Sequence, residues 1–307
     1  MKIKIIKFNK KYEKSVLKFI SKTDFTKRTK VSWRFNKMTG TIALDGKEII
    51  GVLPFENVNL KFKNKYQKVL WISALYVNPK HRNKKIGTML LSHAEKIFKN
   101  SFNYIFVMRH DLGTKAYQWY IKNNFSKIAN IISLEKKIKK PVVKYKYKVL
   151  NNFSDFKKNG NLLLKSFNEN NKNFDGFKKR TNKFWFNLKY HYYSSNYKFK
   201  IILENSKYFN YALVGKTKMR DNHYRLDILE YINNDVNNDS LLYLIEDYAF
   251  KNEIKKIRYQ TIKSNIKKIK FLKSNFFTRW ETNSLVKEIS NAKVNFKNYK
   301  YFQTEYI

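Results

Sequence analysis

The sequence predicts a mixed α/β (α+β) protein made of two tandem domains, each with a mixed, mostly antiparallel sheet flanked by helices. Three observations support this prediction. The chain has 307 residues, about twice the length of an ordinary domain. Short strand-like apolar runs alternate with segments of helical periodicity. The order of these elements in residues 1–140 recurs in residues 141–307, so we place the domain boundary at the lysine-rich segment around Pro141.

Composition excludes several classes of protein. Hydrophobic residues make up 43% of the chain and aromatic residues 17%, which is too much apolar material for a disordered protein. No run approaches the ~18 consecutive apolar residues of a membrane span, and the N-terminal apolar run is too short for a signal peptide. We therefore expect a cytoplasmic protein. The absence of cysteine removes thiol chemistry and zinc–thiolate sites, and we expect no metal.

The first domain is predicted to have the element order β-α-α-β-β-β-α-β-α-β. The apolar stretch at 69–77 has the nearly continuous hydrophobicity of a central strand. The sequence "DGK" at residues 45–47 favours a hairpin turn. The expected strands span 2–8, 41–45, 49–55, 69–77, 104–107 and 131–138, and the expected helices span 10–22, 25–35, 86–98 and 115–122.

The second domain is predicted to repeat this order. "YIKNNFSK" at 120–127 aligns with "FLKSNFFT" at 271–278, and each match falls at the end of a short helix near the end of its half. The expected strands span 145–150, 199–204, 211–216, 225–232 and 256–261, followed by closing strands from Phe277 onward. The expected helices span 153–168, 177–193, 240–252 and 266–273.

The stretch "VNPKHRNKKIGT" at residues 77–88 is the main candidate site. It follows a buried strand and opens a helix, so backbone N–H groups and the positive end of the helix dipole converge there. Gly87 allows a ligand to approach closely. A diphosphate would fit such a loop. The competing interpretation is a solvated basic turn between a strand and a helix.

Two motifs in the first half resemble those of the GCN5-related N-acetyltransferase family. The first is Val77-x-Pro79, followed by Arg82 and by Gly87 at the start of a helix. The second comprises Ala116, Tyr120, Lys122, Asn124 and Phe125 after the next strand. The resemblance is close over residues 1–140, and for 141–307 it rests on the order of elements alone.

The resemblance implies transfer of an acetyl group from acetyl-CoA to a primary amine of a small molecule or amino sugar by direct attack. It implies that Tyr120 is the acid that protonates the leaving thiolate, and Glu56 is the first choice for the base, with His110 and Asp111 as alternatives. Tyr120 also fits a core residue, and Glu56 a solvated one. Backbone N–H groups of Leu75, Tyr76 and Val77 would stabilise the oxyanion. The pyrophosphate would bind to Arg82, Asn83, Lys84, Lys85, Ile86, Gly87 and Thr88.

Two positions depart from the family pattern. Lys85 replaces the first glycine of the loop and would be strained if the backbone there requires a positive φ angle. Asn124 replaces the glycine before Phe125, which is a mild change because asparagine tolerates the left-handed conformation.

The second half is predicted to be a degenerate copy that binds no CoA and contributes to the acceptor site. Phe271 stands where the first half has Tyr120 and has no proton to donate. Asp235 and Asp239 follow the matching central strand and would repel a diphosphate. The aromatic residues 184–186 and 190–193 would either line an acceptor cleft or pack in the core.

The net charge of +42 suggests an alternative function, that of a nucleic-acid-associated protein. Only nine of the 65 basic residues are arginine, whereas nucleic-acid sites favour arginine, so we interpret the charge as compositional. The sequence also leaves open an acetyltransferase that acts on a charged tRNA, on a protein N-terminus or on a lysine. We expect a monomer or a homodimer that binds acetyl-CoA and a small amine.

Overall fold

The computed structural model describes residues 3–21, 39–62, 65–72, 74–109, 114–139, 146–185, 198–204, 209–219, 221–234, 240–262 and 277–288. The chain forms two compact units. Unit 1 comprises Met1–Leu60, Tyr66–Ile128 and Asn283–Asn295, and unit 2 comprises Lys61–Lys65, Ala129–Thr282 and Phe296–Ile307. Unit 1 therefore includes a segment from the C-terminal half of the chain, and unit 2 includes a short segment from the N-terminal half. The predicted helices at 25–35 and 266–273 lie outside the described residues.

The sheet of unit 1 has the strand order β1-β2-β3-β4-β6-β13, with β5 paired to β3. Neighbouring strands with a described register are antiparallel except for β4 and β6, which are parallel. The predicted hairpin is confirmed, and Gly46 in its turn has a φ of 59°. The strands are β1 (Ile3–Lys7), β2 (Thr39–Asp45), β3 (Glu48–Phe62), β4 (Lys65–Ile72), β5 (Tyr76–Val77), β6 (Tyr104–Arg109) and β13 (Phe277–Glu288).

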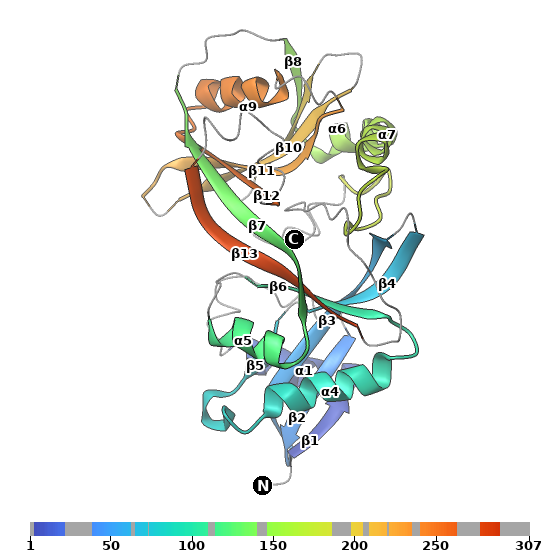
Figure 1. Ribbon diagram of the computed structural model, residues 1–307. Helices are drawn as coiled ribbons and strands as arrows, with labels where there is room; N and C mark the ends of the chain where they lie inside the picture. Colours follow the sequence, from blue (N-terminus) through green and yellow to red (C-terminus); the bar gives the residue numbers. More distant parts are fainter. Residues whose placement is uncertain are drawn as a thin grey trace. The chain divides into compact units, whose positions relative to one another are not determined.

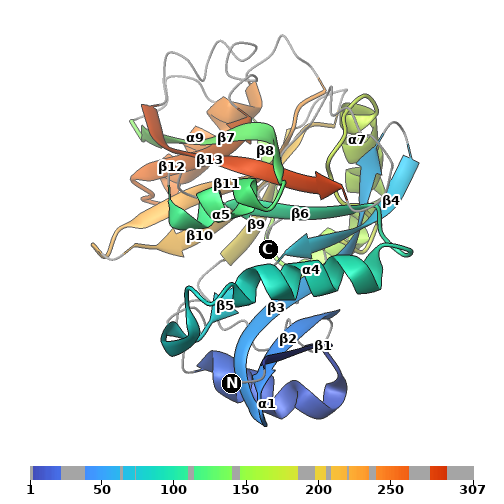
Figure 2. The same ribbon diagram turned by 60° about the horizontal axis from the view of Figure 1, so that its bottom comes forward.

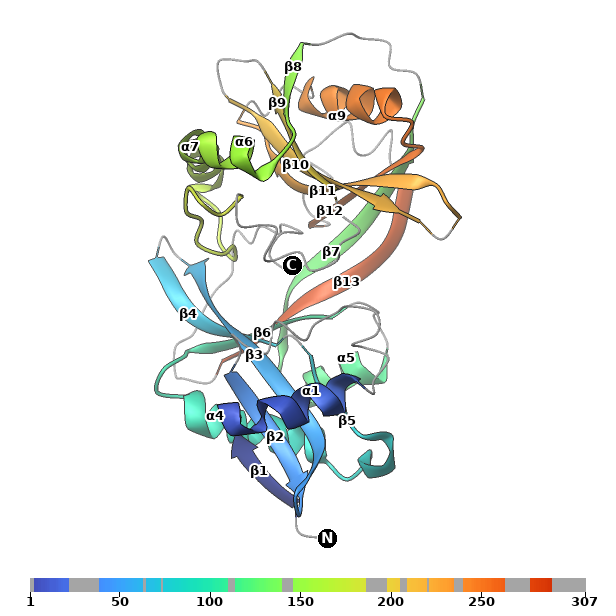
Figure 3. The same ribbon diagram turned by 180° about the vertical axis from the view of Figure 1, so that it is seen from behind.

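Helices cover both faces of this sheet. Helix α1 (Glu13–Ser21) buries Val16 and Ile20 on one face, where a short 3-10 turn, η1 (Lys10–Tyr12), precedes it. Helices α4 (Ile86–Phe98) and α5 (Lys115–Lys122) pack on the other face, as Figures 1 and 3 show from the two sides. Alternation of side chains along the strands supplies apolar residues to both faces.

A glycine in β3 lets α4 lie close to the sheet. A Cβ atom on Gly51 would stand 3.2 Å from Ile86 and 3.3 Å from Leu90, which is tighter than an ordinary contact. The buried side chains Leu90, Leu91 and Ala94 follow the spacing of one helix face. The first turn of α4 is thereby fixed against β3.

Unit 2 has the strand order β7-β12-β11-β10-β9-β8, antiparallel except for β11 and β12. Helix α9 (Ser240–Lys251) covers one face, and α6 (Phe153–Lys158) and α7 (Gly160–Asn171) lie over the other (Figure 3). The strands are β7 (Ser126–Lys137), β8 (Tyr147–Leu150), β9 (Lys198–Glu204), β10 (Tyr211–Lys218), β11 (Tyr224–Ile232) and β12 (Lys256–Ile262).

Three sequence predictions about elements were wrong. The single strand expected at 69–77 is split into β4 and β5. The single helix expected at 153–168 is two helices, and Gly160 is required at their junction because a Cβ there would stand 1.9 Å from the carbonyl oxygen of Asn182. Residues 177–185 form turns and isolated bridges instead of the start of a helix; the rest of that prediction lies outside the described residues.

Strand β13 lies between β6 and β7 in the strand order, and Figure 2 shows it in red alongside β6. Its residues 283–288 belong to unit 1 and its earlier residues to unit 2. The compact units therefore do not follow one cut in the chain, and the functional boundary at residue 140 stays a prediction. In the part of the chain that the structure describes, no helix combines the length and the apolar character needed to cross a membrane.

Candidate functional site

The split in the central strand opens a gap in the unit 1 sheet. Strand β4 pairs with β6 as far as Trp71 and Phe106. Two residues of β5 instead pair with β3, where Val77 lies opposite Gly51. Among the described strands, β5 has β3 as its one neighbour. The other edge of β5 therefore presents backbone N–H and C=O groups to an extended ligand.

The turn after β5 is fixed by local hydrogen bonds. A 3-10 turn, η2 (Pro79–His81), begins with a proline whose φ suits this position, and the Asn78 side chain accepts a hydrogen bond from the N–H of Lys80 at 3.1 Å. The Nε of Arg82 donates to the carbonyl of Val77 at 3.3 Å, and its guanidinium lies 5.8 Å from the Tyr76 ring centroid. Arg82 is thus held at the strand end while the residue remains exposed.

The loop before α4 has an unusual backbone. Asn83 and Lys85 have φ angles of 65° and 56°. Lys85 is the N-cap residue of α4 and makes no capping hydrogen bond with its side chain. The family pattern's glycine is therefore replaced by a residue that adopts the left-handed conformation at a cost of about 1 kcal/mol. The predicted strain at Lys85 is present, and Asn124 likewise has a φ of 64°.

The first turn of α4 is suited to an anion. Its first helical hydrogen bond runs from the N–H of Met89 to the carbonyl of Lys85 at 3.0 Å. The preceding N–H groups of Ile86, Gly87 and Thr88 have no acceptor within the helix and point out from its positive end. Exposed Lys80, Arg82, Lys84 and Lys85 surround this end. The residues therefore fit a diphosphate.

Packing does not explain Gly87. Its φ is not positive, and an added Cβ would meet Leu75 at 3.4 Å and Trp119 at 3.5 Å, which are ordinary contacts. A glycine in a helix is less favourable than alanine. A glycine here is instead what close approach of a ligand backbone or phosphate to the main chain requires.

Trp119 joins α5 to this turn, a role that the sequence did not predict. Its Nε1 donates to the Thr88 hydroxyl at 3.3 Å, and its ring faces Gly87. A tryptophan next to Tyr120 on an amphipathic helix is typical of a core residue, so the residue order alone gives no signal for this role.

Tyr120 and Glu56 are not brought together. Tyr120 is 6% exposed and lies in the core cluster under α4, edge-to-face with Trp119 and Phe125 at centroid distances of 5.0 and 5.1 Å. Glu56 is half-buried on β3. Its neighbour Phe55 belongs to the Tyr120 cluster, so the Glu56 side chain projects from the opposite face. His110 and Asp111 lie outside the described residues.

The start of α9 in unit 2 is bonded to other side chains of the same unit. Helix α9 also follows one of two parallel neighbouring strands, β11, and precedes the other, β12. At its first residue the Ser240 hydroxyl donates to the Glu204 carboxylate, which also accepts from Asn210. The Asn210 side-chain oxygen accepts the N–H of Asn234 at 2.8 Å. Asp235, Asp239 and Phe271, on which the sequence prediction rested, lie outside the described residues.

The described part of the aromatic segment, Phe184 and Trp185, packs in the core of unit 2. Trp185 is fully buried, so it does not line a cleft. Its Nε1 and the Tyr211 hydroxyl donate to Glu230 at 2.8 and 3.0 Å, and Arg180 pairs with the same carboxylate at 3.1 Å. Burial and the Glu230 charge raise the pKa of Tyr211. The neighbouring aromatic residues 186 and 190–193 lie outside the described residues.

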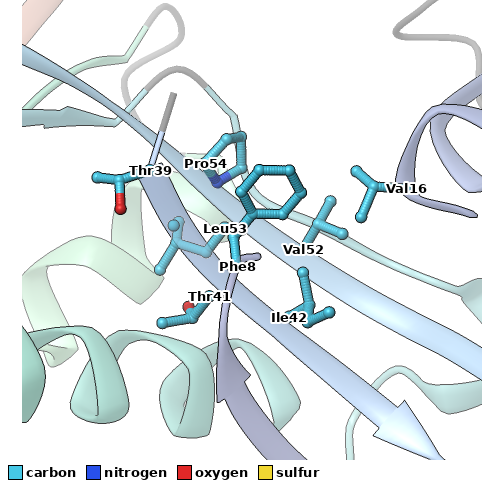
Figure 4. A pocket seen from close by; sticks show the side chains of 9 residues that line it. Phe8, Val16, Thr39, Thr41, Ile42, Val52, Leu53 and Pro54 are labelled. Carbon is cyan, nitrogen blue, oxygen red and sulfur yellow. The ribbon is translucent and has the colours of Figure 1, made fainter. Parts of the chain in front are cut away.

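A small pocket lies on the α1 side of unit 1 (Figure 4). None of the predicted site residues lines it. It is lined by Phe8, Val16, Thr39, Gly40, Thr41, Ile42, Val52, Leu53 and Pro54.

The comparison with known family models finds a match in the N-terminal half of the chain. Residues 12–125 match the model of the acetyltransferase (GNAT) family. A comparison with curated proteins finds no match. Similar solved structures include a GCN5-related N-acetyltransferase from Anabaena variabilis, with a TM-score of 0.70 and 10% identity over 94% of this chain and 73% of that one.

Two further structures match nearly the whole chain. Eis1 from Mycobacterium abscessus has a TM-score of 0.60 and 9% identity over 94% of this chain and 74% of that one. A tandem GNAT protein from the clavulanic acid biosynthesis pathway has a TM-score of 0.57 and 10% identity over 95% of this chain and 100% of that one. At these identities the likeness is one of fold. The chain therefore has a fold similar to that of tandem GNAT proteins, and its residues 12–125 match the acetyltransferase (GNAT) family.

Proposed function

We propose that unit 1 transfers an acetyl group from acetyl-CoA to the primary amine of a small molecule or an amino sugar. The observation that carries this proposal is the combination of a β5 edge that no described strand covers with an uncapped, basic helix N-terminus directly after it. The first fits the extended amide arm of CoA, and the second fits its diphosphate.

The proposed reaction forms a C–N bond and breaks the C–S bond of the thioester. Of the backbone N–H groups predicted at Leu75, Tyr76 and Val77, that of Tyr76 points toward β3 in this register, so those of Leu75 and Val77 stabilise the negative charge that develops on the carbonyl oxygen. Tyr120 delivers a proton to the departing thiolate, and Glu56 takes one from the attacking amine. The acid meets the sulfur and the base meets the nitrogen, so the two residues do not need to be adjacent.

The position of Glu56 supports its assignment. Strand β5 runs antiparallel to β3 and pairs at Gly51 and Val52. The residues before Tyr76 therefore run beside the part of β3 that follows Val52, where Glu56 lies. That places this carboxylate on the strand bordering the gap.

The role of the second half remains a proposal as well. We propose that residues 141–307 bind no CoA, because Glu204 already supplies a carboxylate at the α9 terminus and Asn210 already binds the loop N–H of Asn234. The contribution of this half to the acceptor site stays a prediction.

Two measurements test the proposed activity. CoA at 100 times its Kd should add about 2.7 kcal/mol to the free energy of unfolding, and acetyl-CoA consumption should appear in a screen of amines, amino sugars and peptides. Tyr120→Phe should keep the CoA stabilisation and lower kcat at least tenfold. Absence of stabilisation by millimolar CoA would contradict the proposal.

A further inference from the structure

The strand that completes the sheet of unit 1 comes from the far end of the chain. Residues Asn283–Glu288 of β13 pair with β6 at six positions, from Arg109 to Tyr104. The other neighbour of β6 is β4, which pairs with it at two positions, Ile105 and Phe106. Most of the described backbone pairing of β6 is therefore made with the C-terminal half of the sequence.

The side chains of β13 reach the core that supports the candidate site. Leu285 is fully buried and belongs to the same cluster as Tyr120, Leu70 and Val107. Its Cα partner in the register is Val107, which follows the last residue of β6 paired with β4. Leu285 thus fills the layer that holds Tyr120 and the strand bordering the gap.

An ion pair extends this contact to α4. The Nζ of Lys287 lies 2.5 Å from Oε1 of Glu95 on α4, and the two side chains are 14% and 27% exposed. Partial burial weakens solvent screening of such a pair. Strand β13 therefore touches both elements of the proposed CoA site, the sheet beside the gap and the helix that would receive the diphosphate.

We propose that Leu285 and Lys287 are positioning residues for the acetyl-CoA site, so that a half of the chain without a CoA site of its own is required to build the site in the other half. The function of β13 is to hold β6 and α4 in place. The expected effect of β13 on CoA binding rests on the proposed function. The role of β13 in holding β6 and α4 in place does not depend on that function.

The first experiment breaks the chain between the halves. A protease site is inserted between Lys139 and Lys146, and the folded protein is cleaved. The two fragments should co-elute in native gel filtration and keep the CoA stabilisation of the intact chain. Release of an N-terminal fragment that remains folded and still gains stability with CoA would overturn the proposal.

The second experiment tests positioning by hydrogen exchange. In Leu285→Ala, the amides of residues 104–109 should exchange at least tenfold faster and the KM for acetyl-CoA should rise, whereas Leu285→Met restores both. Leu241→Ala is the matched control, because Leu241 is equally buried in unit 2; it should change neither. Unchanged exchange of residues 104–109 in Leu285→Ala would show the assignment to be wrong.

The two proposals fail in different ways. If the intact chain shows no stabilisation by CoA, the proposed function fails, and fragment association and hydrogen exchange still decide the role of β13. If CoA binds but neither the fragments nor the exchange rates respond as expected, the proposed function stands and the role of β13 fails.

Discussion

The N-termini of α4 and α9 occupy matching places in the two units and differ in the side chains around them. Each helix lies in the chain between two parallel neighbouring strands. In unit 1 these are β4 and β6, with the short β5 before the helix, and in unit 2 they are β11 and β12. The turn before α4 is basic and lacks a side-chain cap. At the start of α9, Ser240 donates to the Glu204 carboxylate, and Asn210 binds the same carboxylate and the N–H of Asn234.

Under the proposed function, this difference is how one fold keeps a ligand site in one unit and lacks it in the other. A helix N-terminus needs hydrogen-bond acceptors for its free N–H groups, and these come from a bound anion or from the protein itself. In unit 2 the Ser240 hydroxyl at the start of α9 is bonded to Glu204, and Asn210 binds both Glu204 and the N–H of Asn234. In unit 1 no side chain caps α4, and we propose that the CoA diphosphate supplies the acceptors.

The largest expected effect comes from blocking the α4 terminus. Arg82→Ala combined with Gly87→Asp removes one cation and places a carboxylate where the diphosphate would lie, so the stabilisation by CoA should disappear. Differential scanning fluorimetry with and without CoA measures it. Asp235→Ala, in the turn of the second half, is the control and should leave the full stabilisation. Equal stabilisation by CoA in the double variant and in Asp235→Ala would contradict the proposal that only the first half binds CoA.

The next effect comes from opening the α9 terminus. Glu204→Ala leaves Ser240 and Asn210 without their acceptor, so the free energy of unfolding should fall by about 1–3 kcal/mol. Glu204→Gln keeps an acceptor oxygen and should lose less. Urea unfolding gives the values, and CoA binding should be unchanged in both variants. Loss of CoA binding in Glu204→Ala would indicate that CoA binds to the second half of the chain, which contradicts the proposal.

Gly87→Ala separates folding from binding. The added methyl group makes ordinary contacts with Leu75 and Trp119 and improves helix propensity by up to about 1 kcal/mol. The free protein should therefore become more stable while its affinity for CoA falls. Thermal unfolding and isothermal titration of the same sample measure the two changes. A simultaneous gain in both would mean that Gly87 does not face the ligand.

The smallest effect concerns the strained loop. Lys85→Gly removes the cost of the left-handed conformation but adds chain entropy to the unfolded state, so the net gain should be roughly 0.5 kcal/mol. Lys84→Gly is the matched control, because its φ is not positive, and it should be destabilising. Chemical unfolding of both variants decides the sign. If Lys85→Gly is less stable than Lys84→Gly, the left-handed backbone at Lys85 does not cost the protein free energy of unfolding.

Local signals predicted most elements of the fold. Some features depend only on residues that are neighbours in the sequence. These are the hairpin around Gly46, the amphipathic face of α4 and the left-handed Asn124. The basic loop with Arg82 and Gly87 was recognisable for the same reason. The strain at Lys85 could be predicted because the family pattern has a glycine at this position, and a glycine there suggests a positive φ angle.

Several features depend on residues distant in the sequence. The split between β4 and β5 arises because β5 pairs with β3 while β4 pairs with β6, and the apolar run at 69–77 gives no sign of it. Glu204 reaches Ser240 through the packing of β9 and α9. Strand β13 pairs with β6, about 180 residues earlier in the chain. No periodicity or motif encodes these long-range contacts.

The contrast between the two helix termini is tested most directly by the stoichiometry of CoA binding. Isothermal titration of the full chain should give one CoA per chain, and Gly87→Asp should abolish that binding while Glu204→Ala retains it. Two equivalents per chain, or one equivalent that survives Gly87→Asp, would contradict the account.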